Sequence, residues 1–401
     1  MPSETKNKRK QTRLLKRRQK VSTLIVEICK IEKIDAHPNA DRLELAHVKG
    51  WICIVQKGAF RPGDKVVYIP IDSILPEILE ARIFGGDSKI KLHKHRIQTI
   101  EIRGAISQGL VVSLESVSLP PDLEVGTDVK ETLGIEKYEP PELGAPQVPG
   151  EPRARRFNNP NFHKYTNIEN IKNYPNVFID QETGKPKIVW MTEKLHGMNS
   201  RAGNLPFEAA GFLEKALRVF RIRSGFEFCY GSHNCEMQYK APGANYGKTR
   251  ESFNKDVGTD AFFQMVEKYE LIKKLGKHEL VYFEVYGGGV QKNYWYGLPL
   301  GEKRIAIIDV KINGVYLDTA DAFKFCTQRG LPFVPILYHG PFSMEIANKV
   351  LEGPSVICAD QKVKEGVVIK SDREQTCHMG RMVLKHINPE YLLLKGNTDF
   401  H

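Results

Sequence analysis

The sequence predicts an α+β protein in which a small N-terminal β-barrel is followed by a larger mixed α/β domain. Three observations support this prediction. Short segments rich in β-branched residues recur between residues 22 and 114, with a turn about every ten residues. A segment rich in Pro, Glu and Arg follows at 138–165, and beyond Thr166 strand-like and helix-like segments alternate. A chain of 401 residues is long enough for two or three domains.

The first domain is expected over residues 21–137. Its strand-like segments are bounded by turn residues such as Gly50, Gly58 and the run Pro62-Gly63-Asp64. Several short strands separated by such turns are typical of a small barrel. The segments lie at 22–34, 42–48, 51–56, 65–71 and 109–114.

A basic segment, KIKLHKHR, lies within this barrel before the last strand-like segment. Lysine and histidine side chains on a barrel loop could bind an RNA backbone. The candidate RNA-binding residues are Lys89, Lys91, Lys94 and Arg96. A solvated charged loop explains the segment equally well, so both interpretations stay open.

Most of the excess basic charge lies in a tail. The chain carries 59 Lys and Arg against 48 Asp and Glu, and residues 1–20 hold nine of the basic residues with a single acid, Glu4. Such a run repels itself, so the tail is expected to be disordered. It could bind phosphates, act as a nuclear address or only solubilise the chain.

Cysteine usage and hydropathy indicate the compartment. Seven cysteines are scattered through the chain without a CxxC pair, which argues against a disulfide framework and for a reducing, intracellular setting, nuclear or cytoplasmic. No stretch reaches the ~20 apolar residues of a membrane span, so no membrane partner is expected.

The residues at 138–165 are expected to form a linker of polyproline character, since they include the run YEPPELGAPQVPGEPRARRF. The second domain is expected over 166–401. Its helices are expected at 207–221, 260–274 and 319–328.

Four segments of the second domain place charged residues beside strand-forming ones. In the first, an apolar strand ends at Lys194 and a turn follows at Gly197. A rigid strand end can aim a lysine into a pocket, where the unprotonated amine is a nucleophile. A lysine ordinarily has a pKa near ~10.4, which neighbouring cations or a bound metal lower. A surface lysine before a turn would explain this one segment as well.

The other three segments follow in order along the chain. One is an apolar strand that carries Glu284 in its middle and is followed by three glycines. A buried acid needs a partner such as a ligand hydroxyl, although an outward-facing acid remains an alternative. The last two segments place Glu365, Lys370 and Lys385 beside β-forming residues. Lysines bind phosphate as point charges, and a carboxylate can hold a hydrated metal ion.

Taken together and in this order, the four segments resemble the motifs of the covalent nucleotidyltransferase superfamily, which includes polynucleotide ligases and mRNA capping guanylyltransferases. EKLHGMN at 193–199 and GGGVQKNYWYG at 287–297 resemble the RNA ligase 2 and kinetoplastid editing-ligase group. DNA ligases and capping enzymes typically carry Asp where this chain has His196. HPNADRLEL, from His37, resembles the start of OB-fold modules, so the barrel is expected to be an OB fold as in RNA ligases of the Naegleria and Deinococcus type.

The resemblance implies a role for each residue of the first two motifs. Lys194 is the expected catalytic nucleophile, which would become adenylated. Glu193, Gly197 and Asn199 are expected at the nucleotide, with Glu193 at the start of the adenine pocket. Glu284 is expected to hold the ribose.

It also implies roles for later residues. Glu365 is expected to position the water shell of Mg²⁺ or Mn²⁺. Val368 would lie against the adenine, and Lys385 would contact the α-phosphate with Lys370 close enough to assist. His233, or the serine before it, stands where the family has an arginine, and it is a further candidate for binding RNA.

Two positions depart from the family pattern. The last motif is commonly K-x-K, but Ile387 stands in place of the second lysine, so Arg381 or Lys370 could hold the phosphate instead. The adenine-stacking aromatic is replaced by Ile308, so stacking would be aliphatic.

The function implied by the resemblance is that of an ATP-dependent RNA ligase, with ATP and RNA ends or a nicked RNA duplex as partners. A capping guanylyltransferase or a DNA ligase of the same superfamily is an alternative, against which His196 and the segment at 287–297 argue. A non-catalytic RNA-binding protein is a second alternative. A basic tail and a barrel suffice for it, but it leaves the ordered lysine and glutamate motifs unexplained.

Overall fold

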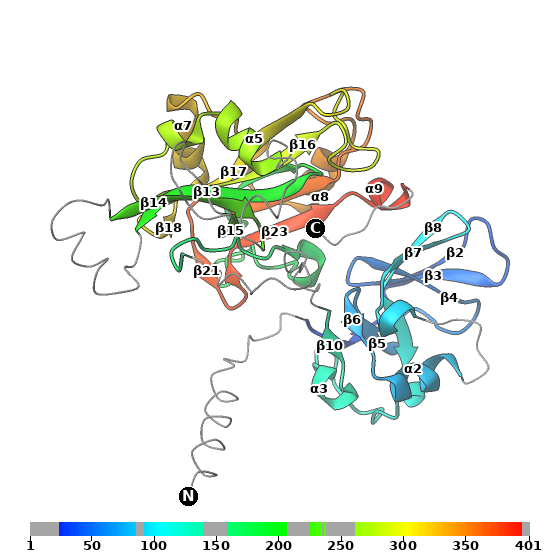
Figure 1. The fold of residues 1–401 in the computed structure, drawn as a ribbon. Helices are drawn as coiled ribbons and strands as arrows, with labels where there is room; N and C mark the ends of the chain where they lie inside the picture. The colour runs from blue at the N-terminus through cyan, green and yellow to red at the C-terminus, as the bar shows by residue number, and fades with distance from the viewer. Residues whose placement is uncertain are drawn as a thin grey trace, which may run out of the picture. The chain divides into compact units, whose positions relative to one another are not determined.

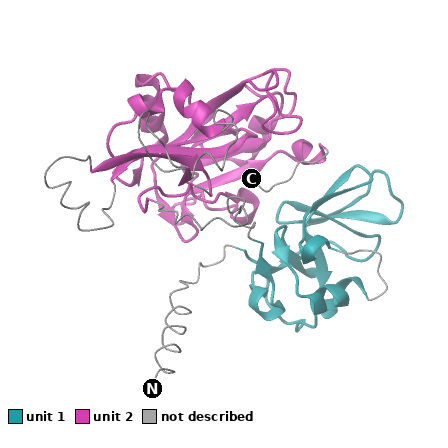
Figure 2. Ribbon diagram, in the orientation of Figure 1, with its two compact units in different colours: residues 1–140, 398–401 teal, residues 141–397 magenta. Residues whose placement is uncertain are grey.

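In the computed structural model, the chain is described over residues 24–85, 92–138, 159–206, 225–234, 236–237 and 261–394. It divides into two compact units, one of residues 1–140 with 398–401 and one of residues 141–397 (Figure 2). The predicted tail, the predicted helix at 207–221 and most of the predicted linker lie outside the described residues.

The first unit is built from short antiparallel strands (Figure 1). Two three-stranded sheets have the orders β1-β5-β9 and β2-β3-β4, and β7 with β8 and β6 with β10 form two-stranded pairs. The strands are β1 (Glu27–Lys30), β2 (Lys33–Ala36), β3 (Leu43–Val48), β4 (Trp51–Gln56), β5 (Lys65–Ile69), β6 (Ser73–Ile74), β7 (Thr99–Ile102), β8 (Ala105–Gln108), β9 (Leu110–Ser113) and β10 (Glu136–Lys137). The helices are α2 (Glu77–Phe84), η1 (His93–His95), η2 (Glu115–Val117) and α3 (Lys130–Leu133).

The strand predicted at 22–34 is two strands, because the chain changes sheets in the middle of it. The backbone N–H of Ile31 donates to Asp64 O at 3.0 Å, in continuation of the β1–β5 pairing. The next residue, Glu32, donates to His47 O at 2.8 Å, where the β2–β3 pairing begins. Such a corner lets one continuous β-forming segment contribute to two sheets.

The HPN sequence between β2 and β3 has a structural role. The imidazole of His37 lies 3.0 Å from the carbonyl oxygen of Ile102 through Nε2, and Nδ1 accepts the backbone N–H of Asn39 at 3.1 Å. The Asn39 amide in turn donates to the carbonyl of Arg103 at 2.8 Å. These bonds tie the loop to the β7–β8 hairpin, so the motif can be explained without a ligand.

The second unit contains a five-stranded sheet of order β11-β23-β20-β12-β19 and a six-stranded sheet of order β15-β14-β13-β16-β17-β18. The strands are β11 (Glu169–Asn170), β12 (Ile188–Lys194), β13 (Met198–Pro206), β14 (Phe226–Ser232), β15 (Glu236–Met237), β16 (Glu279–Gly287), β17 (Lys303–Ile312), β18 (Val315–Tyr316), β19 (Ile336–Pro341), β20 (Gly366–Ser371) and β23 (Val383–Ile387), with a small pair β21 (Thr376–Cys377) and β22 (Gly380–Arg381). The helices are η3 (Ile171–Asn173), α5 (Ala261–Lys268), α6 (Leu271–Lys274), α7 (Thr319–Gln328), α8 (Met344–Leu351) and α9 (Pro389–Leu393).

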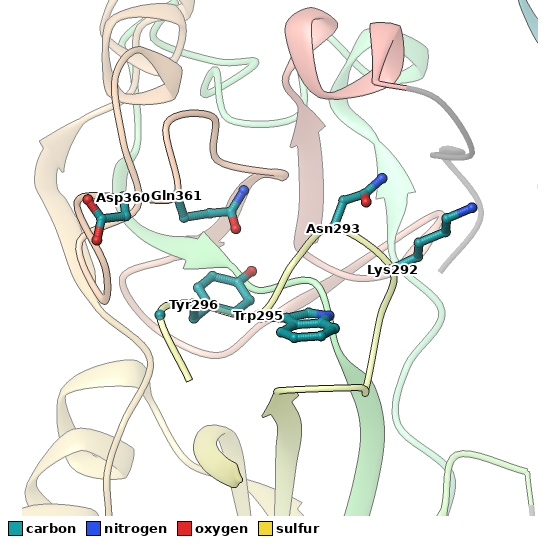
Figure 3. A pocket seen from close by; sticks show the side chains of 7 residues that line it. Lys292, Asn293, Trp295, Tyr296, Asp360 and Gln361 are labelled. Atoms are coloured by element: carbon teal, nitrogen blue, oxygen red, sulfur yellow. The ribbon is translucent and has the colours of Figure 1, made fainter. Parts of the chain in front are cut away.

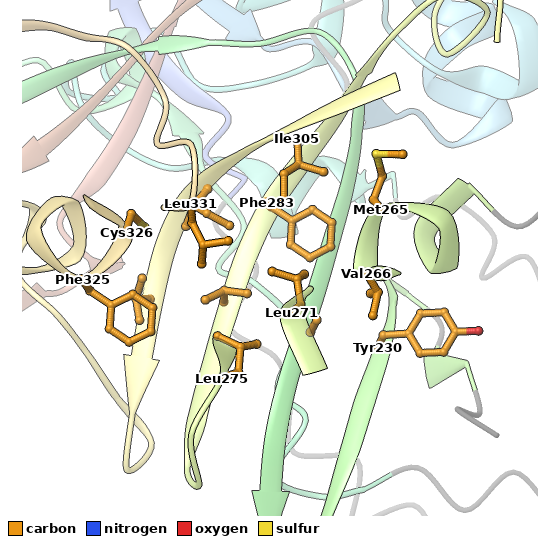
Figure 4. Close-up of a cluster of buried hydrophobic side chains, with 14 of the residues drawn as sticks. Tyr230, Met265, Val266, Leu271, Leu275, Phe283, Ile305, Phe325, Cys326 and Leu331 are labelled. Carbon is orange, nitrogen blue, oxygen red and sulfur yellow. The ribbon is translucent and has the colours of Figure 1, made fainter. Parts of the chain in front are cut away.

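Helices cover one face of each sheet. Val281, Phe283 and Val285 of β16 alternate onto the face that packs against α5, α6 and α7 (Figure 4). On the five-stranded sheet, Val189 and Met191 of β12 pack in the same way against α8. The opposite faces carry the alternate residues of each strand, among them Lys194 of β12 and Glu284 of β16.

A buried carboxylate, Asp309 of β17, connects the two sheets. Its Oδ2 lies 3.0 Å from Lys370 Nζ of β20 and 2.9 Å from Arg381 Nη2 of β22, and it accepts the hydroxyl of Tyr165 at 3.1 Å. The Arg381 guanidinium also lies over the ring of Tyr316, 3.4 Å from its centroid. Burial raises the pKa of Asp309, but the two cations outweigh it, so the net pKa is lowered and the group is ionised.

We expect Asp309→Asn to destabilise the fold strongly, by about 3–5 kcal/mol, because it leaves two buried cations without their anion. Urea unfolding measures the loss. Glu270→Gln, in the exposed pair with Lys273, should leave unfolding nearly unchanged. The double variant Asp309→Asn with Lys370→Met should recover part of the loss, since one stranded cation is gone. Equal midpoints for wild type and Asp309→Asn would contradict this role.

Candidate active site

Lys194 is the last residue of β12 and lies opposite Gly366, the first residue of β20. Its side chain is 13% exposed, so a ligand can reach the amine while the strand pairing holds the stem. The ammonium forms an ion pair with Oε1 of Glu365, whose side chain is only 1% exposed. The sequence therefore delivers a positioned lysine beside a buried acid.

The electrostatics around Glu365 favour its ionised form. Burial by itself raises the pKa of this carboxyl, but the neighbouring Lys194 ammonium and the His196 ring outweigh burial and hold the pKa at about 2. Nδ1 of His196 lies 3.5 Å from Oε2 of Glu365. That oxygen is buried and has no hydrogen-bond partner among the described residues.

The turn after Lys194 fits closely against β16. A Cβ atom at Gly197 would lie 2.3 Å from the carbonyl oxygen of Val285 and 2.9 Å from Cγ of Glu284, so no larger residue fits here. The carbonyl of Gly197 accepts a hydrogen bond from Gln291 Nε2 at 2.7 Å. Glycine thus allows the turn after Lys194 to contact the strand that carries Glu284.

Glu284 lies opposite Asn199 in the β13–β16 register, on the face away from the helices. Burial raises the pKa of Glu284 to about 8, with repulsion from Glu365 adding to it and Lys194 opposing it. Oδ1 of Asn199 is buried and without a hydrogen-bond partner in the described part of the chain. Glu284 is half-buried on this face and is not a fully solvated surface acid.

The oxygens near Lys194 suit a hard divalent cation. The Oε2 of Glu365 and the Oδ1 of Asn199 are the buried acceptors that lack a donor among the residues described around the turn. Mg²⁺ is bound through one or two carboxylates together with waters and substrate phosphates. The residues present fit such a hydrated ion.

Glu193 is buried and faces the loop after α8. Its Oε2 accepts the backbone N–H of Val356 at 2.9 Å, and Oε1 has no partner within the described ranges. Burial raises the pKa of Glu193. The ammonium of Lys364 holds this loop by donating to the carbonyls of Glu352 and Pro354 at 2.5 and 3.1 Å. The loop thus engages one carboxylate oxygen of Glu193, and the other, Oε1, accepts no hydrogen bond from the described residues.

The strand register places Val368 opposite both Thr192 of β12 and Lys385 of β23, on the same sheet face as Lys194. Val368 and Lys385 therefore share one sheet face with Lys194. Ile387, at the place of the second lysine, is buried.

Two of the sequence-based assignments need correction because the side chains are engaged elsewhere. Lys370 was expected at the phosphate, but its ammonium donates to Ile308 O at 2.7 Å and to Asp309 at 3.0 Å in the buried inter-sheet network. Arg381, the alternative, belongs to the same network. Both cations are therefore held in the inter-sheet network.

The predicted RNA contacts on the barrel have different outcomes. Lys89 and Lys91 lie outside the described residues. Lys94 lies in η1 with a left-handed φ of 56°. Arg96 is not available as expected, because it forms an ion pair with Asp72 and lies over the ring of Tyr138 at 3.9 Å.

His233, the other RNA candidate, follows β14. Its backbone N–H donates to the carbonyl of Asn199 at 3.0 Å, so it lies beside β13.

Sequence reasoning missed a set of tyrosines around His196. The hydroxyl of Tyr296 accepts the backbone N–H of His196 at 2.7 Å, and Tyr391 of α9 lies 3.2 Å from its Nδ1 through the hydroxyl oxygen. Tyr294 and Tyr391 also contact the ring edge-on, with centroids 5.0 and 5.3 Å away. The aromatic run at 294–296 was visible in the sequence, but its contact partner was not.

Comparison with known proteins gives a consistent result. An OB-fold domain model matches residues 25–114, and an RNA ligase model matches residues 187–387. The structure is similar to RNA ligase variants from Naegleria gruberi. One, solved with ATP and Mn, is 23% identical with a TM-score of 0.60, covering 92% of this chain and 98% of that one; another, without ligand, is 22% identical with a TM-score of 0.62.

A shorter similarity exists to the phenylalanine–tRNA ligase beta subunit of Geobacter metallireducens. It is 32% identical over 126 residues, which cover 27% of this chain and only 14% of that subunit. The predicted fold class, an OB-fold barrel before a mixed α/β domain, is confirmed. The described helices include none long and apolar enough to span a membrane.

The raised pKa of Glu284 predicts a pH-dependent stability. The folded state keeps the proton up to about pH 8, whereas an unfolded glutamate releases it near 4.5. The free energy of unfolding of the wild type therefore falls as pH rises through that window. The Glu284→Gln variant has no titrating group at this position and does not show this fall. The unfolding free energy of Glu284→Gln relative to wild type should rise by up to about 1.4 kcal/mol per pH unit between pH 5 and 8.

Urea unfolding at several pH values measures this difference. Exposed Glu345→Gln is the control and should follow the wild-type profile. A difference between Glu284→Gln and wild type that does not change with pH would refute the shift.

Proposed function

The chain belongs to the RNA ligase family, and from this premise we propose that it joins RNA 3′-hydroxyl and 5′-phosphate ends with ATP, through a covalent AMP on Lys194. One observation carries the assignment of the nucleophile. Lys194 is a largely buried, reachable lysine fixed by an ion pair with Glu365 at the end of a sheet strand. Around it, buried oxygens of three residues lack donors within the described chain.

In the first step, the Lys194 amine attacks the α-phosphate of ATP; an N–P bond forms, and the bond to pyrophosphate breaks. Lys385 neutralises charge on the α-phosphate, since it lies on the same sheet face two strands away. Glu365 and Asn199 would hold Mg²⁺ or Mn²⁺ through their oxygens, and the ion would supply charge neutralisation for the phosphates.

The adenosine would be bound by three contacts. The unpartnered Oε1 of Glu193 can accept the exocyclic amine of adenine, whereas guanine presents a carbonyl at that position and would be repelled. Glu284, opposite Asn199 in the β13–β16 register, would hydrogen-bond the ribose hydroxyls. Val368 offers an apolar surface to the base, so stacking is aliphatic, as Ile308 also suggested.

The next two steps use the same groups. AMP passes from Lys194 to the RNA 5′-phosphate, which activates it through a phosphoanhydride. The 3′-hydroxyl of the other end then attacks that phosphate and AMP leaves. Positioning and charge neutralisation are what the protein supplies in all three steps. Two residues are candidate contacts to the RNA backbone: Lys94 of the OB unit and His233 beside β13.

Lys194→Ala should abolish covalent labelling by ATP labelled at the α-phosphate, because the only bond to AMP is made by its amine. Gel autoradiography measures labelling, and thermal unfolding checks the fold. Lys349→Ala, an exposed lysine of α8, should label like wild type. A labelled Lys194→Ala protein would end the assignment of the nucleophile. Labelling of wild type by GTP instead of ATP would favour a capping enzyme.

Glu193→Gln should reduce the preference for ATP over GTP by about 10-fold or more, because a charged hydrogen bond to adenine is replaced by an amide that can also donate to guanine. Initial rates of labelling by the two nucleotides give the ratio. Glu345→Gln again provides the matched control. An unchanged ratio would mean that Glu193 does not read the base.

A further inference from the structure

The loop between β16 and β17 is attached to the catalytic residues at three points. Gln291 donates to the carbonyl of Gly197 at 2.7 Å, and the Tyr296 hydroxyl accepts the backbone N–H of His196 at 2.7 Å. The Tyr294 hydroxyl donates to the carbonyl of Val363 at 3.0 Å, two residues before Glu365. The position of this loop is therefore fixed relative to the nucleophile.

Between its buried anchors the loop turns one aromatic residue outward. Tyr294 and Tyr296 are 0% and 4% exposed, whereas Trp295 between them is 42% exposed. The backbone adopts left-handed φ angles at Asn293 (67°) and at Tyr296 (51°). Such conformations are unfavourable for a bulky residue and persist where the surroundings hold them, commonly at functional sites.

Trp295 borders a hollow of about 370 Å³, whose other wall is the loop before β20 (Figure 3). Polar side chains surround it. They come from Lys292, Asn293, Asp360 and Gln361. None of these four side chains forms a hydrogen bond or an ion pair with any residue that the structure describes. The hollow thus combines an aromatic face with uncommitted donors and acceptors.

We propose that this hollow binds one nucleobase of the RNA next to the joining site, stacked on Trp295. The inference rests on the proposed function, because the ligand class follows from RNA as substrate. None of the residues proposed to bind ATP lines the hollow, so the proposed base site and the proposed ATP contacts use different side chains.

The chemistry of the lining fits a single-stranded nucleotide. Bases that leave a helix stack on aromatic side chains, and their edges are read by polar side chains. The amides of Asn293 and Gln361 offer both donors and acceptors, and Lys292 offers a cation for the flanking phosphate. Asp360 accepts hydrogen bonds only, so it favours a base edge that carries an amino group.

The first test compares Trp295→Ala with Trp295→Phe in steady-state joining of a nicked RNA duplex. Loss of stacking should raise KM for RNA about 10-fold in Trp295→Ala, whereas Trp295→Phe keeps a ring and should stay close to wild type. Val315→Ala, which shortens another exposed apolar side chain, should match wild type.

Covalent labelling by ATP without RNA separates two kinds of failure. If wild type forms no adenylate, the proposed function fails. If wild type forms it and seals RNA, but Trp295→Ala has an unchanged KM, the base site fails while the function stands. A Trp295→Ala protein that labels like wild type and shows the raised KM supports the inference, since a folding defect would reduce labelling too.

Fluorescence gives a second readout on the full chain. Of the three tryptophans, Trp51 is 1% exposed and Trp190 is partly buried in a stack with His339, so Trp295 should respond most to a base. A 5′-hydroxyl oligoribonucleotide, which cannot be joined at that end, should quench wild-type emission, and Trp295→Phe should lose most of the quenching. An abasic ribose-phosphate oligomer of equal length should quench little. Equal quenching by both oligomers would show backbone binding only and overturn the proposal.

Discussion

The two sheets of the catalytic unit depend on one buried anion. Asp309 receives Lys370 from the five-stranded sheet and Arg381 from the small β21–β22 pair, while its own backbone belongs to the six-stranded sheet. A carboxylate surrounded by apolar residues is unfavourable unless it is matched, and two cations with a tyrosine hydroxyl match it. The network fixes the spacing at which β12 and β20, with Lys194 and Glu365 at their adjoining ends, face β13 and β16.

Within this frame, the site is built mainly of acceptors. Glu193, Asn199 and Glu365 each keep a buried oxygen without a donor in the described chain, and Glu284 holds a proton that its surroundings disfavour losing. Buried acceptors without partners cost stability, so a fold that retains them is arranged for a ligand that brings donors. ATP carries an amino group and ribose hydroxyls, and a hydrated cation carries water protons. Before a ligand binds, the ion pair with Glu365 holds the Lys194 side chain in place.

The sequence was sufficient to predict the fold class and the family, and insufficient to predict the contacts that support the site. Lys194, Glu284 and Lys385 stand in strands and Glu365 directly precedes one, all with strong β-forming neighbours, and their order along the chain indicated a common site. Lys370 was misassigned, because nothing local marks a lysine as the partner of an acid 61 residues earlier.

The same limit applies to the barrel and the aromatic loop. Arg96 resembled a surface cation of a basic loop, but a long-range ion pair with Asp72 engages it. The split of the segment at 22–34 into β1 and β2 also depends on partners elsewhere in the chain. Local pattern identifies strands and chemistry, whereas pairing between distant segments decides which charges remain available to a ligand.

The loop after β16 shows how chemistry and substrate recognition can share one rigid element. Its inward residues hold the turn at His196 and Gly197, and its outward Trp295 faces solvent. Because alternate residues of one short segment do both, a base stacked on Trp295 would be positioned by the same contacts that position the nucleophile's turn. A ligase has to align two RNA ends with the site from which AMP is transferred, and a shared support reduces the number of independent motions between them. Stacking recognises any base, so such a site would align the RNA end without restricting its sequence.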